Sequence, residues 1–175
     1  MNRHPIQVEE FIIKPQLIWS KQGLLLTSGS LAEGKFNAMT VGWGSMGVMW
    51  KLPFVQVVVR PTRYTFEFME RYDTFTVCAF PDKYYDALQL LGTKSGRDGD
   101  KIAESGLTPA ASTIVAAPCY EQAELVLECR KLYWDDMKKD HFLDNRIEER
   151  YPRHDYHRLY YGEILAILGT KTYQS

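Results

Sequence analysis

Short strand-like runs recur along the chain, and the helical segments between them are brief. The runs are rich in β-branched and apolar residues, a composition typical of strands. They occupy residues 24–31, 36–43, 54–60, 74–80, 123–133 and 157–168. Because the helices are short insertions rather than regular crossovers, a mainly β fold is favoured, as a closed or partly closed antiparallel barrel. No G-x-G-x-x-G follows a strand, so we expect no nicotinamide-binding Rossmann domain.

The segments between the strands carry weaker signals. Tyr64, Phe68 and Tyr72 recur at helical spacing and predict a short helix, and Asp82 to Leu91 predicts a second. Ser95 and Asp98 stand in the S-x-x-D relation of a helix start, so Asp98 is expected to cap a third helix ending at Ser105.

Three further segments complete the reading of the chain. The glycine-rich stretch at 42–53 is read as a loop. Apolar residues alternate with charged ones in the run at 123–133, which predicts a strand with one dry and one wet face. The charged stretch at 135–150 is expected to be an exposed helix or excursion.

Composition limits the classes of protein to consider. The chain has 175 residues, 45% of them hydrophobic, and we expect a single domain over 1–175. A net charge of -1 gives no field that would attract nucleic acid or an anionic membrane. No signal peptide or apolar run of membrane-spanning length stands out, so a cytoplasmic location is expected. Cys78, Cys119 and Cys129 are an odd number without a C-x-x-C pair, which argues against a disulfide framework or a zinc site.

The run Arg60-Pro61-Thr62-Arg63-Tyr64-Thr65 joins an apolar strand to a helix. Guanidinium groups match phosphate oxygens, and the free N–H groups of a helix start add donors and the positive end of its dipole. The run therefore predicts a phosphate site. The alternative is that both arginines pair with surface carboxylates and the threonines cap the helix.

Two further segments suit the same ligand class. "KSGRDGDK", residues 94–101, places three cations, a hydroxyl and two glycines in a loop before a helix, and such a loop can hold an anion. "NAMTVGWG", residues 37–44, combines polar and apolar side chains that could bind the rim and faces of a flat heteroaromatic ring. The plainer interpretations are a flexible charged turn and a hairpin strand with a Trp in the core.

Taken in order, the motifs resemble those of a known family. "NAMTVGWGSMGVMWKLPFVQVVVRPTRYTFEFMERYDTFTV", "SGRDGDK", "LECRKLYW" and "YPRHDYHRLYYGEILAI" resemble the flavin reductase-like family of FMN-binding split barrels, in particular its flavoredoxin-like branch. The resemblance covers about residues 10 to 168. It implies an antiparallel, Greek-key-like split β-barrel with a few short peripheral helices, which forms a homodimer and holds FMN non-covalently near the subunit interface.

The resemblance also implies roles for individual residues. Those expected to line the isoalloxazine and ribityl chain are Asn37, Ala38, Met39, Thr40 and Trp43. Those expected to take the phosphate are Arg60, Thr62, Arg63, Tyr64 and Thr65. Those expected to close over the cofactor are Lys94, Ser95, Gly96, Asp98 and Lys101, with Lys101 and Lys94 as candidates to reach the flavin or its phosphate.

Three functions compete at this level. The first is an NAD(P)H-dependent flavin reductase, the second a flavoredoxin-type carrier that exchanges electrons with a redox protein, and the third a non-redox module for another planar ligand or haem. The redox chemistry would belong to the cofactor, so no catalytic acid or base is assigned. His141 and His157 could reach the flavin edge or the donor, but a surface or packing role is favoured for both. With no third ligand beside His154 and His157, no metal site is expected.

Overall fold

The architecture is an antiparallel sheet that curls into a barrel, with short helices at one end. In this computed structural model, residues 1–175 are described, apart from the side chain of Gln22. The strands are β1 His4–Pro5, β2 Leu24–Ser30, β3 Lys35–Val41, β4 Gly44–Met49, β5 Leu52–Val59, β6 Thr74–Ala79, β7 Pro109–Ala110, β8 Cys119–Tyr120, β9 Leu125–Asp136 and β10 Arg158–Gly169. The α-helices are α1 Pro15–Leu17, α2 Tyr64–Arg71, α3 Tyr85–Thr93, α4 Lys101–Glu104 and α5 Asn145–Glu148. The remaining helical turns are the 3-10 turns η1 Val8–Glu10, η3 Asp82–Tyr84, η4 Lys139–His141 and η5 Lys171–Tyr173, and the π-helical turn η2 Ile18–Gln22.

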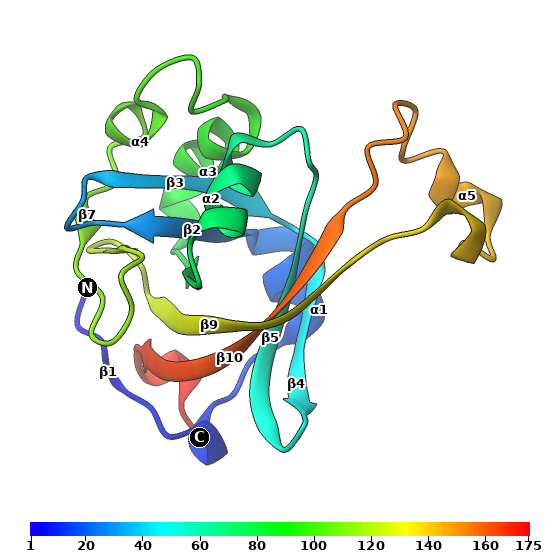
Figure 1. The fold of residues 1–175 in the computed structure, drawn as a ribbon. Helices are drawn as coiled ribbons and strands as arrows, with labels where there is room; N and C mark the ends of the chain where they lie inside the picture. The colour runs from blue at the N-terminus through cyan, green and yellow to red at the C-terminus, as the bar shows by residue number, and fades with distance from the viewer.

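The order of the strands explains why the sheet must curl. Its path is β3-β2-β6-β9-β10-β5-β4, with β1 added beside β10 and β7-β8 paired separately. Thus β3 and β4 stand at opposite ends of the path, yet only Gly42 and Trp43 connect them in sequence. The three Cα–Cα steps from Val41 to Gly44 span at most about 11 Å, so the two ends of the sheet have to lie close together. The helices α2, α3 and α4 gather beside β3 at one end of the barrel (Figure 1).

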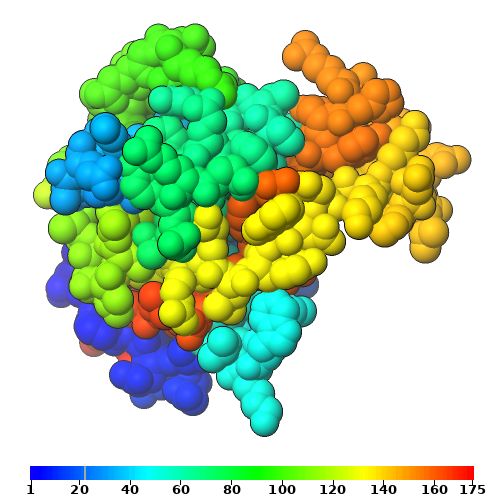
Figure 2. Space-filling model, in the orientation of Figure 1, coloured from blue at the N-terminus to red at the C-terminus, as the bar shows by residue number. Residues whose placement is uncertain are grey.

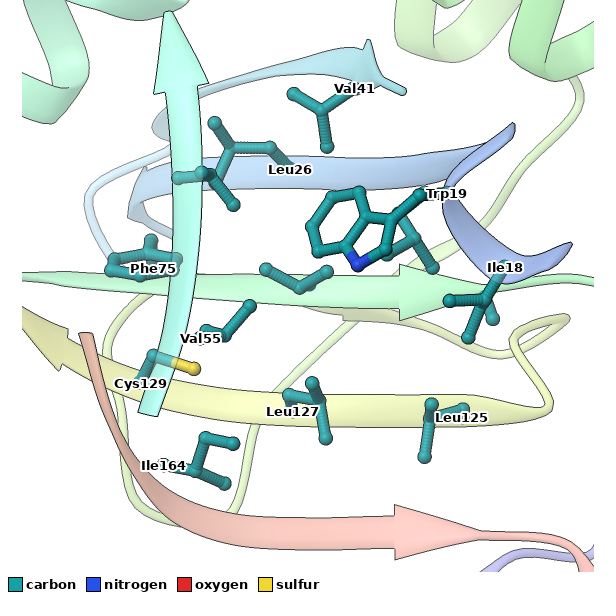
Figure 3. Close-up of a cluster of buried hydrophobic side chains, with 14 of the residues drawn as sticks. Ile18, Trp19, Leu26, Val41, Val55, Phe75, Leu125, Leu127, Cys129 and Ile164 are labelled. Atoms are coloured by element: carbon teal, nitrogen blue, oxygen red, sulfur yellow. The ribbon is translucent and has the colours of Figure 1, made fainter. Parts of the chain in front are cut away.

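Two apolar clusters lie on opposite faces of the curled sheet. The first fills the barrel and includes Leu26, Val55, Phe75 and Leu127, which Figure 3 shows pointing toward one another. The second lies outside, where Leu25, Cys78 and Val126 pack against α3, α4 and residues 107–120. Fully burying a side chain of this size contributes about 1.5–3 kcal/mol, so both faces of β2, β6 and β9 contribute to the stability of the fold.

Residues 137–157 and the hairpin of β4 and β5 project from this body (Figure 1). The excursion between β9 and β10 carries η4 and α5, as the charged sequence at 135–150 predicted. At the hairpin tip, Val48 is 73% exposed and Trp50 is 56% exposed. Trp50 and Lys51 form the turn with positive φ angles of 55° and 62°. No helix among the described residues combines the length and apolar surface needed to cross a bilayer.

The expected order of strands and short helices is confirmed, with three corrections. The stretch at 42–53, read as a loop, contains β4 and the start of β5. The glycines of this stretch lower its strand propensity, and for that reason it was read as a loop. Gly44 is nevertheless required within the strand, because a Cβ there would overlap the Gln56 carbonyl and the Trp19 ring. The helix cap is also displaced. Asp100, and not Asp98, accepts from the Ala103 N–H at the start of α4, at 3.0 Å.

The third correction concerns the face of β9 that was expected to be wet. Glu128 is fully buried, as is Val126 beside it. The Glu128 carboxylate accepts hydrogen bonds from the backbone N–H groups of Thr113, Ile114 and Val115, at 2.7, 2.7 and 3.3 Å, and from the Thr113 hydroxyl at 2.9 Å. A buried carboxylate is tolerated when donors surround it. The alternation in the sequence was real, but residues 107–120 cover the polar face.

Replacing Gly44 with alanine should destabilise the barrel. Overpacking of this kind costs about 1–3 kcal/mol, because the new methyl group meets a backbone carbonyl and an indole ring. Gly47→Ala is the matched control in the same strand, where the nearest atom to the new Cβ is on the Phe54 ring at 3.3 Å. Urea unfolding of the two variants should show the larger loss of unfolding free energy for Gly44→Ala. Equal losses would contradict the claim that close packing requires glycine at position 44.

Candidate functional site

The site begins where β5 ends and α2 starts. A tight turn closed by the bond from Arg63 N–H to the Arg60 carbonyl, at 3.0 Å, brings the chain from the strand into the helix. Arg63 occupies the N-cap position, and its side chain makes no capping hydrogen bond. The first N–H groups of a helix have no partner within the helix. The strand end therefore presents free backbone donors together with the hydroxyls of Thr62 and Thr65.

One small cavity brings the two predicted anion-binding segments together. It has a volume of about 180 Å³. Its lining residues are Thr62, Arg63, Tyr64, Thr65, Thr93, Lys94, Ser95, Gly96 and Lys101. Gly96 lies so close to Asn37 and Tyr64 that a Cβ would overlap both side chains. Only glycine lets the loop approach Asn37 and Tyr64 this closely. Without this approach the cavity would lose one wall.

The electrostatics of this cavity favour an anion. Burial and the neighbouring charge of Arg60 lower the pKa of Arg63. Burial, and then the charge of Arg63, lower the pKa of Lys101 to about 8. A cation whose pKa falls for these reasons lacks a counter-charge. Together with the hydroxyls of Thr62, Thr65 and Ser95, these side chains form a donor set that fits a phosphate monoester.

Arg63 and Lys101 also hold the end of α3. The Arg63 guanidinium donates to the Gly92 carbonyl at 2.6 Å. Lys101 is 2% exposed, and its Nζ donates to the carbonyls of Leu91 and Lys94, at 2.8 and 3.0 Å. Cations suit the C-terminal carbonyls of a helix, which carry the negative end of its dipole. Lys101 was expected to reach the flavin or its phosphate; here its ammonium group is directed into the protein and supports the loop.

Arg60 points away from the cavity. Its guanidinium pairs with Asp155 at 2.7 Å, donates to the Arg150 carbonyl at 2.9 Å and lies 4.8 Å from the centre of the Tyr151 ring. It thus fastens the excursion at 137–157 to the end of β5. The sequence analysis left open the alternative that Arg60 pairs with a carboxylate, and Arg60 makes this pair here. Its charge still lowers the pKa of Arg63.

The loop at 94–101 is held mainly by a residue that was not among the predicted contacts. Arg97 donates to the Thr62 carbonyl at 3.2 Å, pairs with Glu67 at 2.5 Å and stacks over the Tyr64 ring at 4.9 Å. Lys94 pairs with Glu104 at 2.6 Å. Asp98 is exposed and does not line the cavity. The sequence shows the three cations of "KSGRDGDK". It does not show that Lys101 is buried, Lys94 half-buried and Arg97 exposed.

The predicted ring-binding strand β3 lies at the edge of the sheet beside α3. Asn37 is buried and donates to the Thr65 hydroxyl at 2.7 Å, which joins β3 to α2. Thr40 donates to the Leu88 carbonyl at 2.5 Å. Ala38 and Met39 belong to the two apolar clusters, so their side chains are committed to the core. The groups of β3 that remain available to a ligand are the backbone N–H and C=O groups of an edge strand.

Trp43 lies outside β3, in the two-residue connection to β4, and faces the excursion. It is 48% exposed, and its ring lies 5.1 Å from that of His157. The two rings are next to a cavity of about 420 Å³ whose lining residues are Trp43, Asp144, Arg146, Ile147, Arg150 and Tyr151. His157 is buried and bonded to the Tyr151 hydroxyl at 2.8 Å. Burial and Arg60 lower its pKa to about 4, so it is neutral near pH 7, as the packing role favoured from the sequence requires.

Comparisons with known proteins agree with this geometry. A family model described as "Flavin reductase like domain" matches residues 21–172. The fold resembles an FMN-binding domain of a flavin reductases-like enzyme from Shewanella baltica OS155, at 16% identity and a TM-score of 0.69 over 96% of this chain and 77% of that one. It also resembles flavoredoxin from Methanosarcina acetivorans, at 22% identity and a TM-score of 0.65 over 97% of this chain and 74% of that one.

A protein with a split barrel domain from Shewanella frigidimarina NCIMB 400 has the same architecture. Its identity is 17% and its TM-score 0.67, over 86% of this chain and 67% of that one. No curated protein sequence matches this chain. At these identities the solved structures establish the fold, and they confirm the split barrel expected from the sequence. The family model covers most of the chain, and the protein therefore belongs to the flavin reductase-like family.

Proposed function

We propose that this protein binds FMN non-covalently and works as an oxidoreductase that passes electrons from NAD(P)H, or from a redox protein, through the flavin. The observation that carries the proposal is the cavity between the start of α2 and the loop at 94–101, where two uncompensated cations and several hydroxyls meet. Membership of the family and the FMN-binding neighbour from Shewanella baltica support the identity of the ligand.

In this proposal the FMN phosphate occupies the 180 Å³ cavity. Thr62, Thr65 and Ser95 would donate hydrogen bonds from their hydroxyls to the phosphate. Arg63 would supply positive charge and an N–H group other than the one that donates to the Gly92 carbonyl. Lys94 would have to leave Glu104 in order to contribute. A phosphate monoester carries about -1.5 to -2 charges at pH 7, so it would supply the counter-charge that Arg63 lacks.

The isoalloxazine would lie along β3 toward Trp43. The polar rim of the ring needs hydrogen bonds, and an edge strand offers unpaired backbone groups in a row. FMN, when bound, supplies the hydride and electron chemistry. The chain positions the ring, and the neutral His157 and Tyr151 hold Trp43 and the excursion in place beside it.

A nucleotide donor is favoured over a protein donor by the cavity at Trp43. It is about 420 Å³ in volume, and Arg146 and Arg150 line it next to an exposed indole face. Arg146 is already paired with Asp144 at 2.6 Å, which leaves Arg150 as the cation available to a phosphate group. The proposal includes a cytoplasmic location, where reducing conditions suit three free cysteines.

Homodimer formation is the remaining part of the proposal. Val48 and Trp50 expose apolar surface at the hairpin tip, and Trp50 contacts Tyr133 and Tyr161 at ring distances of 6.2 and 6.1 Å. Such a projecting aromatic surface is typical of a protein interface. A second subunit covering the hairpin would remove it from water.

The phosphate assignment predicts a loss of FMN affinity in Arg63→Gln. Removing a charge-assisted hydrogen bond costs about 1.5–3 kcal/mol, or roughly 10- to 150-fold in Kd. Arg60→Gln should have the smaller effect because its guanidinium is bonded to Asp155, and the exposed Arg153→Gln is the control for net charge. Fluorescence titration of the apoproteins with FMN measures the affinities. An unchanged affinity in Arg63→Gln would disprove the assignment.

The donor is tested by mixing the FMN-loaded protein with NADH or NADPH without oxygen in a stopped-flow instrument. Bleaching of the flavin absorbance should saturate with donor concentration, and Arg150→Gln should raise the concentration required for half-saturation several-fold, while Arg153→Gln leaves it unchanged. If neither nucleotide bleaches the flavin, the protein is an electron carrier that depends on a protein donor.

The dimer is tested by placing a charge at the hairpin tip. Val48→Asp should convert the protein to a monomer, because an ionised carboxylate would be buried without a partner. Ile114→Asp is the control, since Ile114 is 61% exposed and lies in the segment that covers β9. Light scattering after gel filtration gives the mass. A monomeric wild-type protein, or a dimer in the Val48→Asp variant, would contradict the proposal.

A further inference from the structure

Beyond its two connections to β9 and β10, the excursion at 137–157 is attached to the body of the protein at one place. Figure 2 shows it, in yellow to orange, standing out from the body and meeting it beside the blue-green run that leads into α2. Among the described side chains, every hydrogen bond and ion pair between this excursion and the rest of the chain goes to Arg60 or Thr62. Trp43 adds a ring contact with His157. The position of the excursion therefore depends mainly on two residues at the end of β5.

Asp155 is the group through which most of this attachment is made. One carboxylate oxygen, Oδ1, accepts from the Arg60 guanidinium at 2.7 Å, and the other, Oδ2, accepts from the Thr62 hydroxyl at 3.5 Å. The side chains of Arg60 and Asp155 are only 26% and 14% exposed, so solvent screens their pairing less than it screens a pair on the open surface. The carboxylate thus engages a charge and a hydroxyl of the same short run.

The same run is part of the phosphate cavity. Thr62 lines that cavity together with Arg63, and its hydroxyl is one of the donors proposed for the phosphate. The charge of Arg60 reaches the cavity as well, since it lowers the pKa of Arg63. A hydroxyl has a single proton to donate, so Thr62 cannot donate to a phosphate and to Asp155 at once. Two anions that share a donor and a neighbouring cation repel each other, and each weakens the binding of the other.

The excursion in turn carries part of the cavity at Trp43. Arg150 and Tyr151 line this cavity, and both contact Arg60. The Arg150 carbonyl accepts from the Arg60 guanidinium at 2.9 Å, and the Tyr151 ring lies 4.8 Å from it. If the guanidinium turned toward a phosphate, both residues would lose this support. One ion pair therefore joins the walls of the two cavities.

We propose that Asp155 is a positioning residue that couples the two cavities. It holds the excursion in place through Arg60 and Thr62, and a phosphate group in the cavity at Arg63 competes for these same groups. Filling the phosphate cavity loosens the excursion and frees the wall of the cavity at Trp43 to move. Because coupling between two sites is reciprocal, removing the Asp155 carboxylate strengthens the binding of the phosphate. This inference rests on the proposed flavin site, since the flavin phosphate is the competing anion.

The test compares FMN with riboflavin, which lacks only the phosphate, in variants that each lose one negative charge. Asp155→Asn removes the competing charge and keeps the shape of the side chain. Asp140→Asn is the matched control, because Asp140 is exposed in the same excursion and makes no ion pair among the described side chains. Arg60→Gln breaks the same ion pair from the other side, so the measurement of mobility does not depend on one variant.

Hydrogen exchange of peptides from 137–157, followed by mass spectrometry, measures how often the excursion opens. In the unliganded proteins, Asp155→Asn and Arg60→Gln should raise this exchange at least about fivefold, the lower end of typical coupling between sites, and Asp140→Asn should leave it unchanged. The wild-type protein saturated with FMN should exchange faster in this segment than the same protein saturated with riboflavin. That difference should vanish in Asp155→Asn.

Titration of the apoproteins gives the reciprocal measurement. Asp155→Asn should lower the Kd of FMN several-fold and leave the Kd of riboflavin unchanged, whereas Asp140→Asn should change neither. Equal exchange in the unliganded wild-type protein and Asp155→Asn would overturn the proposal, as would an unchanged Kd of FMN in that variant or exchange no faster with FMN than with riboflavin. If the wild-type protein binds FMN no more tightly than riboflavin, the proposed phosphate site fails instead, and exchange in the unliganded variants still decides whether Asp155 holds the excursion.

Discussion

Two cations at the end of one short helix organise the whole site. Arg63, from the start of α2, and Lys101, from the start of α4, donate to the last carbonyls around α3. These three elements come from separate parts of the chain, and these bonds bring them together with the Arg97 contacts to Thr62 and Glu67 and the Lys94–Glu104 pair. Because the same two groups also line the cavity, the forces that assemble the helices place positive charge where the ligand is proposed to bind.

The barrel supplies the second constraint. Since Gly42 and Trp43 join the two ends of the sheet, Trp43 is held at the seam of the barrel rather than on a free loop. Arg60 and Asp155 then fix the excursion over this seam, with the Tyr151 and His157 pair beneath it. The proposed ring site and the proposed donor site thus meet at one indole, which packs against the His157 ring.

Much of this arrangement was predictable from local sequence patterns. Apolar and β-branched runs identified most of the strands, alternation identified β9, and the clustering of Arg63, Thr65 and Ser95 near helix starts identified the cavity. The failures share a physical cause, which is contact between residues distant in sequence. The partner of Arg60 lies 95 residues away, the burial of Glu128 depends on the loop at 113–115, and Gly44 is required by Trp19. Lys101 was expected to reach the flavin or its phosphate, because nothing next to it in sequence shows that carbonyls at the end of α3 accept its hydrogen bonds.

The burial of Glu128 has a consequence for the reactivity of the thiols. Three consecutive amides converge on one carboxylate, so the segment at 113–115 depends on a single side chain for its attachment. Burial first, and the charge of Glu128 in addition, raise the pKa of Cys78, Cys119 and Cys129. Because the thiolate is the reactive form of cysteine, a carboxylate enclosed at the centre of the sheet helps to keep all three sulfurs inert near neutral pH.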